Sequence, residues 1–192
     1  MSRRRKEDAL ARKVEPPTVQ GRVAPHSLDV EAAVLASCLL DTEALDKVAP
    51  FLSAPHFYSE SNGRIYEACT ELQAAGQPVD VVQVARWLRD KGRLAQVGGP
   101  SYLAQLTDAT PAIAHVEFHA KSIREYWRLR MLIATCQRVS AEGYGDVGAI
   151  ATFIEEASSA IEAIRGDSAD ARNDPQHVGV VARKAFTTIE AH

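Results

Sequence analysis

Residues 110–165 constrain the fold of this chain most, because they predict two long helices folded back on each other. Thr110-Pro111 is a helix start signal, since proline fits the first turn, where its missing N–H is not needed. Nothing breaks a helix from Ile113 to about Glu142, and a glycine-containing turn over 143–148 follows. Apolar residues recur at spacings of three and four in both arms: Val116, Ala120, Ile123, Trp127, Met131 and Ala134, then Ile150, Ile154, Ala157, Ile161 and Ile164.

The length of this helical hairpin predicts that it projects from the rest of the protein. A first arm of roughly 30 residues is about 45 Å long. A small domain cannot cover both sides of such a rod, and projecting apolar helices usually find a partner. The pattern therefore favours assembly over catalysis.

The remaining sequence predicts an all-α protein with a compact head of about six short helices before the hairpin. Glycine and capping residues divide that head: Gly76 ends one helix, and Asp80 caps the next, with Gln83 three residues on as in a capping box. No alternating strand pattern is present. We expect a flexible basic arm over 1–24, the head over 25–110, the hairpin over 111–165, a linker over 166–177 and a last helix over 178–192.

That last helix is predicted to be amphipathic and detached from the head. The preceding linker is rich in Gly, Ser, Asp, Asn and Pro and offers nothing to bury. A helix this short is marginal alone in water, so its apolar face must dock on something. The docking residues we expect are Val178, Val181, Ala185, Phe186 and Ile189.

Charge and cysteine usage narrow the class of protein. The net charge of −3 gives the whole chain no electrostatic footprint for nucleic acid, although residues 1–13 are basic. That arm lacks the apolar region of a signal peptide, and no window is apolar enough to span a bilayer. Three cysteines without a C-x-x-C spacing predict reduced, structural thiols in a cytosolic protein: Cys38, Cys69 and Cys136.

Residues that would carry chemistry do not form a recognisable active site. No G-x-x-x-x-G-K-[ST] loop occurs, and the lone G-x-G over 143–145 follows a helix rather than a strand. His115 and His119 lie four residues apart on one helix face, but no H-E-x-x-H motif accompanies them, so we expect packing or surface roles. We therefore predict no catalytic residue, cofactor or metal in this chain.

A series of short motifs follows one another in a fixed order along the chain. They are Pro25-His26-Ser27-Leu28-Asp29-Val30-Glu31-Ala32-Ala33-Val34-Leu35, Leu39-Leu40-Asp41, Leu52-Ser53 with His56-Phe57-Tyr58, Arg64-Ile65-Tyr66-Glu67-Ala68, Gly76-Gln77-Pro78-Val79-Asp80, Gly92-Arg93-Leu94, Val97-Gly98-Gly99-Pro100-Ser101-Tyr102-Leu103 and Thr110-Pro111. In this order and spacing, the chain from Pro25 to Ile164 resembles the N-terminal domain of bacterial replicative DNA helicases, the DnaB family. At residue 56 that family more usually has an acidic residue than histidine.

The resemblance implies an assembly role in a cytoplasmic bacterial replisome. In the family, hairpins pair, three pairs form a collar on a hexamer, and the collar recruits primase. A helicase loader is a further partner that the resemblance suggests. The residues after 178 resemble the family's linker helix, which docks on a neighbouring motor domain. A RecA-like ATPase domain, with its ATP, Mg²⁺ and single-stranded DNA sites, follows in the family and is absent from these 192 residues, so we expect a truncated protein.

Two sets of hairpin residues are the candidates for these contacts. For the seam between subunits we expect Trp127, Met131, Leu132, Ile150, Ile154 and Ile161, although some of them could only hold the two arms together. For primase we expect exposed polar positions near the turn, namely Arg130, Gln137, Arg138 and Tyr144.

Two alternatives from other classes stay open at this point. One is a stand-alone nucleic-acid-binding module that uses the basic arm, which salt-dependent binding lost on deletion of residues 1–13 would reveal. The other is a primase-type helicase-interaction domain, whose fold is similar. The opening over 25–40 and the last helix favour the helicase.

Overall fold

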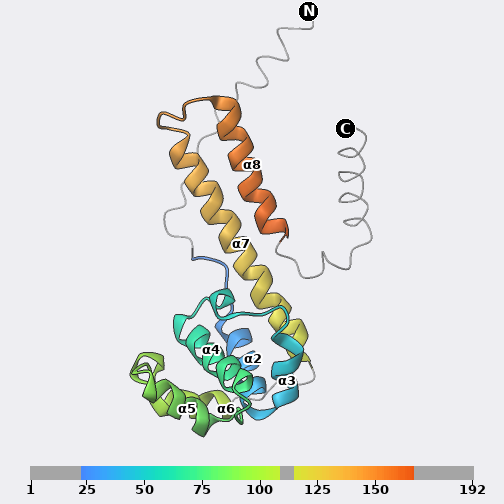
Figure 1. Ribbon diagram of the computed structural model, residues 1–192, viewed down its shortest axis with the longest axis vertical. Coiled ribbons are helices and arrows are strands. Elements are labelled where there is room, and N and C mark those ends of the chain that lie inside the picture. Colours follow the sequence, from blue (N-terminus) through green and yellow to red (C-terminus); the bar gives the residue numbers. More distant parts are fainter. Residues whose placement is uncertain (1–22, 109–114, 167–192) are drawn as a thin grey trace, which may run out of the picture.

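The computed structural model describes residues 23–108 and 115–166, and every regular element in these ranges is helical (Figure 1). The predicted all-α fold, with a bundle of short helices followed by a long hairpin, is confirmed. The Thr110-Pro111 start signal, most of the basic arm and the last helix lie outside the described residues. The elements are α2 (Leu28–Leu40), α3 (Thr42–Val48), η1 (Ala54–His56), α4 (Glu60–Ala74), α5 (Val81–Asp90), η2 (Ala95–Val97), α6 (Gly99–Asp108), α7 (Val116–Glu142) and α8 (Ile150–Gly166).

Short polar side chains begin the head helices, as the sequence suggests. Oδ1 of Asp80 accepts hydrogen bonds from the backbone N–H groups of Val82 and Gln83, both at 2.8 Å, so it satisfies two free donors of α5. Asp41 caps α3 in the same way, through the N–H of Glu43 at 2.9 Å. These caps fix where each helix starts.

Glycine ends α4, because the chain there needs a left-handed backbone. Gly76 has φ +67°, a conformation that costs other residues more. The next N–H, from Gln77, then bonds back to the carbonyl of Leu72 at 2.9 Å. The predicted helix end at Gly76 is confirmed.

The core lies between α2 and the helices packed around it, chiefly α3, α4, α6 and α7. Its central side chains are fully buried, among them Leu35, Leu45, Ile65, Leu88 and Leu103. The first turns of α7 close this core with Val116, Ala120 and Ile123. The base of the hairpin is thus part of the head's hydrophobic core.

A buried carboxylate joins three helices of the head. Glu31 on α2 is 2 % exposed, and its oxygens accept hydrogen bonds from the N–H of Tyr58 at 2.6 Å, the N–H of Ser59 at 3.2 Å and Nδ2 of Asn62 at 2.9 Å. Asn62 in turn accepts from the hydroxyl of Tyr102 on α6 at 2.7 Å. Glu31 therefore stabilises the start of α4, where the helix dipole favours an anion.

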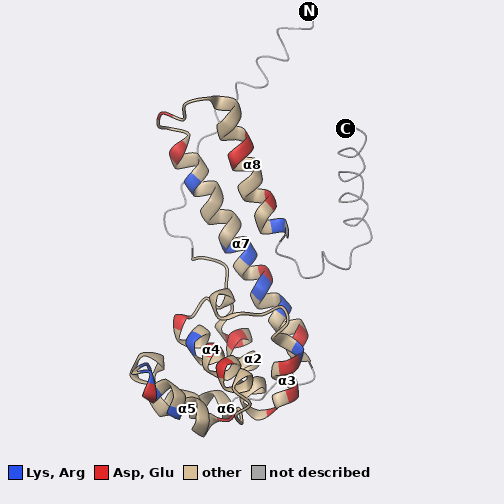
Figure 2. Cartoon of the chain, viewed as in Figure 1, with Lys and Arg blue, Asp and Glu red and all other residues tan. Residues whose placement is uncertain are grey.

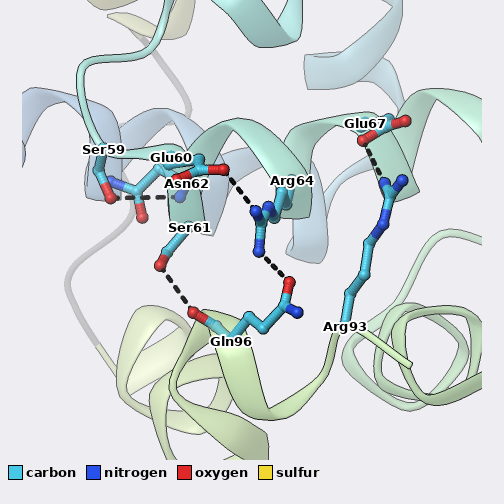
Figure 3. A network of polar contacts seen from close by, with 8 residues as sticks. All are labelled: Ser59, Glu60, Ser61, Asn62, Arg64, Glu67, Arg93 and Gln96. Atoms are coloured by element: carbon cyan, nitrogen blue, oxygen red, sulfur yellow. Dashed lines mark hydrogen bonds and ion pairs between the residues drawn. The ribbon is translucent and has the colours of Figure 1, made fainter. Parts of the chain in front are cut away.

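Polar contacts along the exposed side of α4 fasten it to the segment before α6 (Figure 3). Ser61 donates to the carbonyl of Gln96 at 3.1 Å, and Arg93 pairs with Glu67 at 3.0 Å. Arg64 donates to the side chains of both Glu60 and Gln96. These partly exposed contacts fix the position of the α5–α6 connection more than they add stability.

Gly63 allows η1 to lie directly against α4. A Cβ at this position would stand 2.8 Å from the carbonyl oxygen of Ala54, closer than such atoms come. The close approach places His56, the last residue of η1, and Tyr58, two residues later, beside α7. These residues form the junction between head and hairpin described below.

The hairpin projects from the head as a rod (Figure 1). α7 has 27 residues, so it is about 40 Å long. Its first half packs on α2 and α3, and its second half lies beside the antiparallel α8. None of the described helices is long and apolar enough to cross a membrane.

Candidate assembly interface

The two arms of the hairpin hold each other through a narrow seam. Half-buried residues recur on each arm at spacings of four and three, so each set forms one stripe. At the end of the hairpin opposite its turn, Nε of Arg128 donates to the carbonyl oxygen of Ile164 at 3.4 Å. This bond satisfies a free carbonyl of the last turn of α8. The seam consists of Arg128, Leu132, Thr135 and Val139 on α7 and Phe153, Ala157, Ala160 and Ile164 on α8.

Beside this seam the hairpin exposes a second, larger apolar surface. On α8, Ile150, Ile154 and Ile161 are 68 %, 57 % and 42 % exposed and lie on one stripe about 60–100° from the seam. On α7, Leu129 and Cys136 lie at about the same angle from the seam, with Ile133 next to them. In an antiparallel pair of helices these two stripes turn to the same side. We call this surface, made of Leu129, Ile133, Cys136, Ile150, Ile154 and Ile161, the apolar face.

The apolar face deepens into a groove where the hairpin opens toward the head. Leu129 and Leu132 form one wall of this groove, and Ile161 and Ile164 form the other. Glu125, Tyr126, Arg128 and Arg165 make its polar rim. Four of the six residues predicted for the interface between subunits lie in the apolar face or this groove: Leu132, Ile150, Ile154 and Ile161.

The other two residues predicted for the interface between subunits, Trp127 and Met131, lie on a different side of α7. Met131 is two residues from Leu129, and therefore about 200° around the helix from it. Trp127 is half-buried, and its ring centroid lies 4.6 Å from that of His56. Both residues continue the side of α7 that packs on the head, so Trp127 contacts the head of its own chain.

The prediction that Arg130 is an exposed position near the turn was wrong. Its guanidinium donates from Nη1 to the carbonyl of Pro25 at 2.9 Å and from Nη2 to the carbonyl of His56 at 2.8 Å. It also lies 5.6 Å from the ring centroid of Tyr58, which stacks on His26 at 3.8 Å. Partial burial lowers the pKa of Arg130. Arg130 therefore locks the hairpin to the head, and periodicity alone could not reveal this.

The remaining primase candidates are exposed. Gln137 and Arg138 both lie on the part of α7 beyond the head; Arg138 is on the side opposite the apolar face and pairs with Glu142 at 3.0 Å, whereas Gln137, four residues after Ile133, borders that face. Tyr144 is 80 % exposed in the turn.

The cysteines divide into two kinds. Cys38 and Cys69 are buried in the head core, as predicted, and burial raises the pKa of Cys38 to about 12 and that of Cys69 further. The same prediction was wrong for Cys136, which is exposed in the apolar face. No group of three or more His, Cys, Asp and Glu side chains within residues 23–108 and 115–166 could hold a metal ion.

With this geometry established, comparison with known proteins identifies the family. The family model described as "DnaB-like helicase N terminal domain" matches residues 23–125, which cover the head and the first turns of α7. The chain belongs to this family. A crystal structure of the N-terminal domain of DnaB helicase from Mycobacterium tuberculosis superposes with a TM-score of 0.69 and 30 % identity, over 73 % of this chain and 99 % of that one.

Curated relatives of this DnaB-like domain are considerably longer. The chain is 38 % identical over 128 residues to the replicative DNA helicase DnaB of Treponema pallidum, and 35 % identical over 140 residues to that of Geobacillus stearothermophilus. These matches cover 67 % and 73 % of the chain but only 29 % and 31 % of the relatives. The chain thus spans about a third of the proteins it matches.

A second structural neighbour shows the same fold in a larger protein. A structure described as a DnaB-like replicative helicase and its interactions with primase matches with a TM-score of 0.59 and 24 % identity, over 86 % of this chain and 35 % of that one. The predicted docking residues of the last helix, Val178, Val181, Ala185, Phe186 and Ile189, lie outside the described residues.

Proposed function

We propose that this chain is the assembly and primase-recruiting domain of a hexameric, ATP-dependent replicative DNA helicase in the bacterial cytoplasm. Membership of the DnaB-like family and the relatives' names support this role. The motor that binds ATP, Mg²⁺ and single-stranded DNA belongs to a domain outside these 192 residues. The single observation that carries the proposal is the apolar face, which the chain's own head leaves uncovered.

The physical argument for self-association starts from the exposed isoleucines. Three large apolar side chains on one stripe of α8, continued by Leu129 and Ile133 on α7, form a contiguous apolar surface of the kind that marks an interface. Two such hairpins, each already an antiparallel pair of helices, complete a four-helix contact when their apolar faces meet. We propose that three such pairs build the hexameric collar.

The test of self-association is the mass of the chain in solution at several concentrations. Ile154→Asp places a charge in the apolar face and should shift the species from a pair to a monomer at the same concentration. Ser159→Asp is the matched control, because Ser159 is exposed on α8 but lies about 200° around the helix from Ile161. An Ile154→Asp mass equal to that of the wild type would exclude this interface.

For primase we propose the side of α7 beyond the head, with Gln137 and Arg138. Arg138 stays accessible when the apolar faces meet, since it points away from them, and Gln137 lies at the edge of the contact. The second structural neighbour, a DnaB-like helicase described with its interactions with primase, supports primase as the partner. A pull-down with the cognate primase C-terminal domain should weaken with Arg138→Glu and remain unchanged with Ser159→Asp.

Arg130→Glu is a poor probe of primase binding, because Arg130 holds the head. Undiminished capture by Arg138→Glu would remove this side of α7 from the proposal.

We propose in addition that the helix over 178–192 docks on a neighbouring motor domain and that a helicase loader binds the assembled ring. In the full-length helicase, Phe186→Asp should weaken the ring if this helix docks on the motor domain, because it places a charge among the predicted docking residues.

A further inference from the structure

A cavity between α5 and the end of α4 takes no part in the assembly and primase contacts proposed above. It has a volume of about 430 Å³, which is in the range of small-molecule sites. We call it the Trp87 cavity. Figure 1 places α5 at the end of the head away from the hairpin, so the cavity stays open when the apolar faces meet. Gln77, Pro78, Gln83, Arg86, Trp87 and Asp90 are among its lining residues.

The wall of this cavity offers a flat aromatic surface and free amides. Trp87 is half-buried and packs against the head core, so its indole ring is held in place. The side-chain amides of Gln77 and Gln83 have no hydrogen-bond partner in the part of the chain that the structure describes. Each amide supplies both donors and an acceptor, as the edge of a nucleobase requires. A planar base could therefore stack on Trp87 and bond to either glutamine.

The charge around the Trp87 cavity is positive, although the whole chain is acidic (Figure 2). Residues 81–97 hold four basic side chains and one acidic side chain, which gives +3 against −3 for the chain. Arg93 pairs with Glu67 at 3.0 Å, and Arg86 reaches Asp90 only at 4.0 Å. The remaining two basic residues, Arg89 and Lys91, have no carboxylate partner among the described residues.

The combination of these features selects the class of ligand. The ammonium of Lys91 lies 5.5 Å from the ring centroid of Trp87, so aromatic surface and positive charge occupy the same place. Single-stranded nucleic acid needs both, because its bases stack and its phosphates pair with cations. An acidic peptide needs the charge but no stacking surface, and a duplex hides the faces of its bases.

We propose that the Trp87 cavity binds one base of a single-stranded DNA, whose neighbouring phosphates lie on Arg86 and Arg89. These two arginines are three residues apart on α5, so they lie on one side of the helix. The site goes beyond the proposed function, because it gives the strand a contact outside the motor domain. Only the choice of DNA over RNA rests on the proposed function; the stacking and the phosphate contacts do not.

Tryptophan fluorescence tests the stacking directly. The chain has two tryptophans, so Trp127→Phe leaves Trp87 as the only one. Oligothymidylate added at low salt should quench the fluorescence of Trp87, and added salt should reverse the quenching. A duplex of the same length should not quench it. Absence of quenching by oligothymidylate would overturn the proposal, and tighter binding of oligouridylate would overturn DNA as the ligand.

Substitution of Trp87 separates stacking from packing. Trp87→Leu keeps an apolar side chain but removes the aromatic face, and should raise the dissociation constant of a labelled oligothymidylate about tenfold. Trp87→Phe keeps an aromatic face and should retain most of the affinity. Urea unfolding of both variants checks the fold. Affinity that is unchanged in both variants, or reduced equally in both, would overturn the stacking.

The salt dependence of binding tests the phosphate contacts. Arg89→Gln should reduce the slope of log affinity against log salt by about 0.7, the contribution of one phosphate on a single strand. Lys47→Gln is the matched control, because Lys47 is partly exposed on α3, which packs on α2 and α7. A slope that Arg89→Gln leaves unchanged would remove the phosphate from this side of α5.

Two other binding modes would overturn the proposal. Binding that is lost on deletion of residues 1–13 but unchanged by Trp87→Leu belongs to the basic arm. Binding of polyglutamate without binding of oligothymidylate identifies a site for acidic peptides. The mass measurement is independent of both: a chain that pairs but binds no oligothymidylate loses this site and keeps the assembly role, whereas a monomer that binds it loses the assembly role alone.

Discussion

The head and the hairpin treat apolar side chains in opposite ways. In the head, α2 and α4 bury Leu35 and Ile65 completely, and the polar groups near them are satisfied by Glu31 and Asn62. In the hairpin, isoleucines of the same kind face outward on α8. The core of the head is therefore closed, whereas the hairpin has an apolar face that no other part of residues 23–108 and 115–166 covers.

The largest expected effect contrasts an isoleucine from each region. Ile65→Ala should lower the free energy of unfolding by about 2–5 kcal/mol, because it leaves a cavity in a closed core. Ile154→Ala should cost a similar amount only in the pair, and that loss should appear as dissociation on dilution. Urea unfolding measures the loss of stability in the monomer, and sedimentation measures the dissociation of the pair. A large loss of monomer stability with Ile154→Ala would contradict the expected difference between the two isoleucines.

Arg130 tests how firmly the two regions are joined. Arg130→Ala removes two charged hydrogen bonds to backbone carbonyls and should destabilise the chain by about 1.5–3 kcal/mol. Hydrogen exchange at residues 23–27 and 56–58 should speed up, while exchange in α4 and α5 should not. Arg138→Ala, at an exposed ion pair, is the control and should change stability by less than about 1 kcal/mol.

Alkaline pH should weaken the head and leave the hairpin's own contacts unchanged. Burial raises the pKa of Cys38 from 9.0 to about 12, so the folded state keeps a proton that the unfolded state releases. The stability from this thiol is complete below pH 9 and declines as the pH rises toward 12, by about 1.4 kcal/mol per pH unit within that window. Cys38→Ala should reduce the pH dependence of urea unfolding between pH 9 and 10.5 but not abolish it, because burial also raises the pKa of Cys69.

The smallest expected effect concerns thiol labelling of the chain without any substitution. Cys136 should react with a water-soluble maleimide in the folded protein, whereas Cys38 and Cys69 should react only after unfolding. Raising the protein concentration should slow the labelling of Cys136 if the apolar faces meet. Equal labelling at all concentrations would place Cys136 outside the interface.

Much of the fold could be predicted because local signals specify it. Helix type follows from apolar spacing, and the ends of α4 and α5 follow from Gly76 and Asp80, whose backbone and capping chemistry act within a few residues. The apolar stripe formed by the exposed isoleucines of α8 could also be predicted, because their spacing places them on one side of the helix.

The sequence alone determined an all-helical chain with a hairpin that has more apolar surface than its two arms can bury. Only the tertiary structure decided which side of α7 meets the head. Periodicity groups residues into stripes, but α7 carries apolar residues on more than one side, and nothing local separates Trp127 and Met131 from Leu129 and Ile133. The buried carboxylate of Glu31 and the clamp of Arg130 likewise depend on partners 27 to 105 residues away, because long-range contacts exist only once the helices have packed.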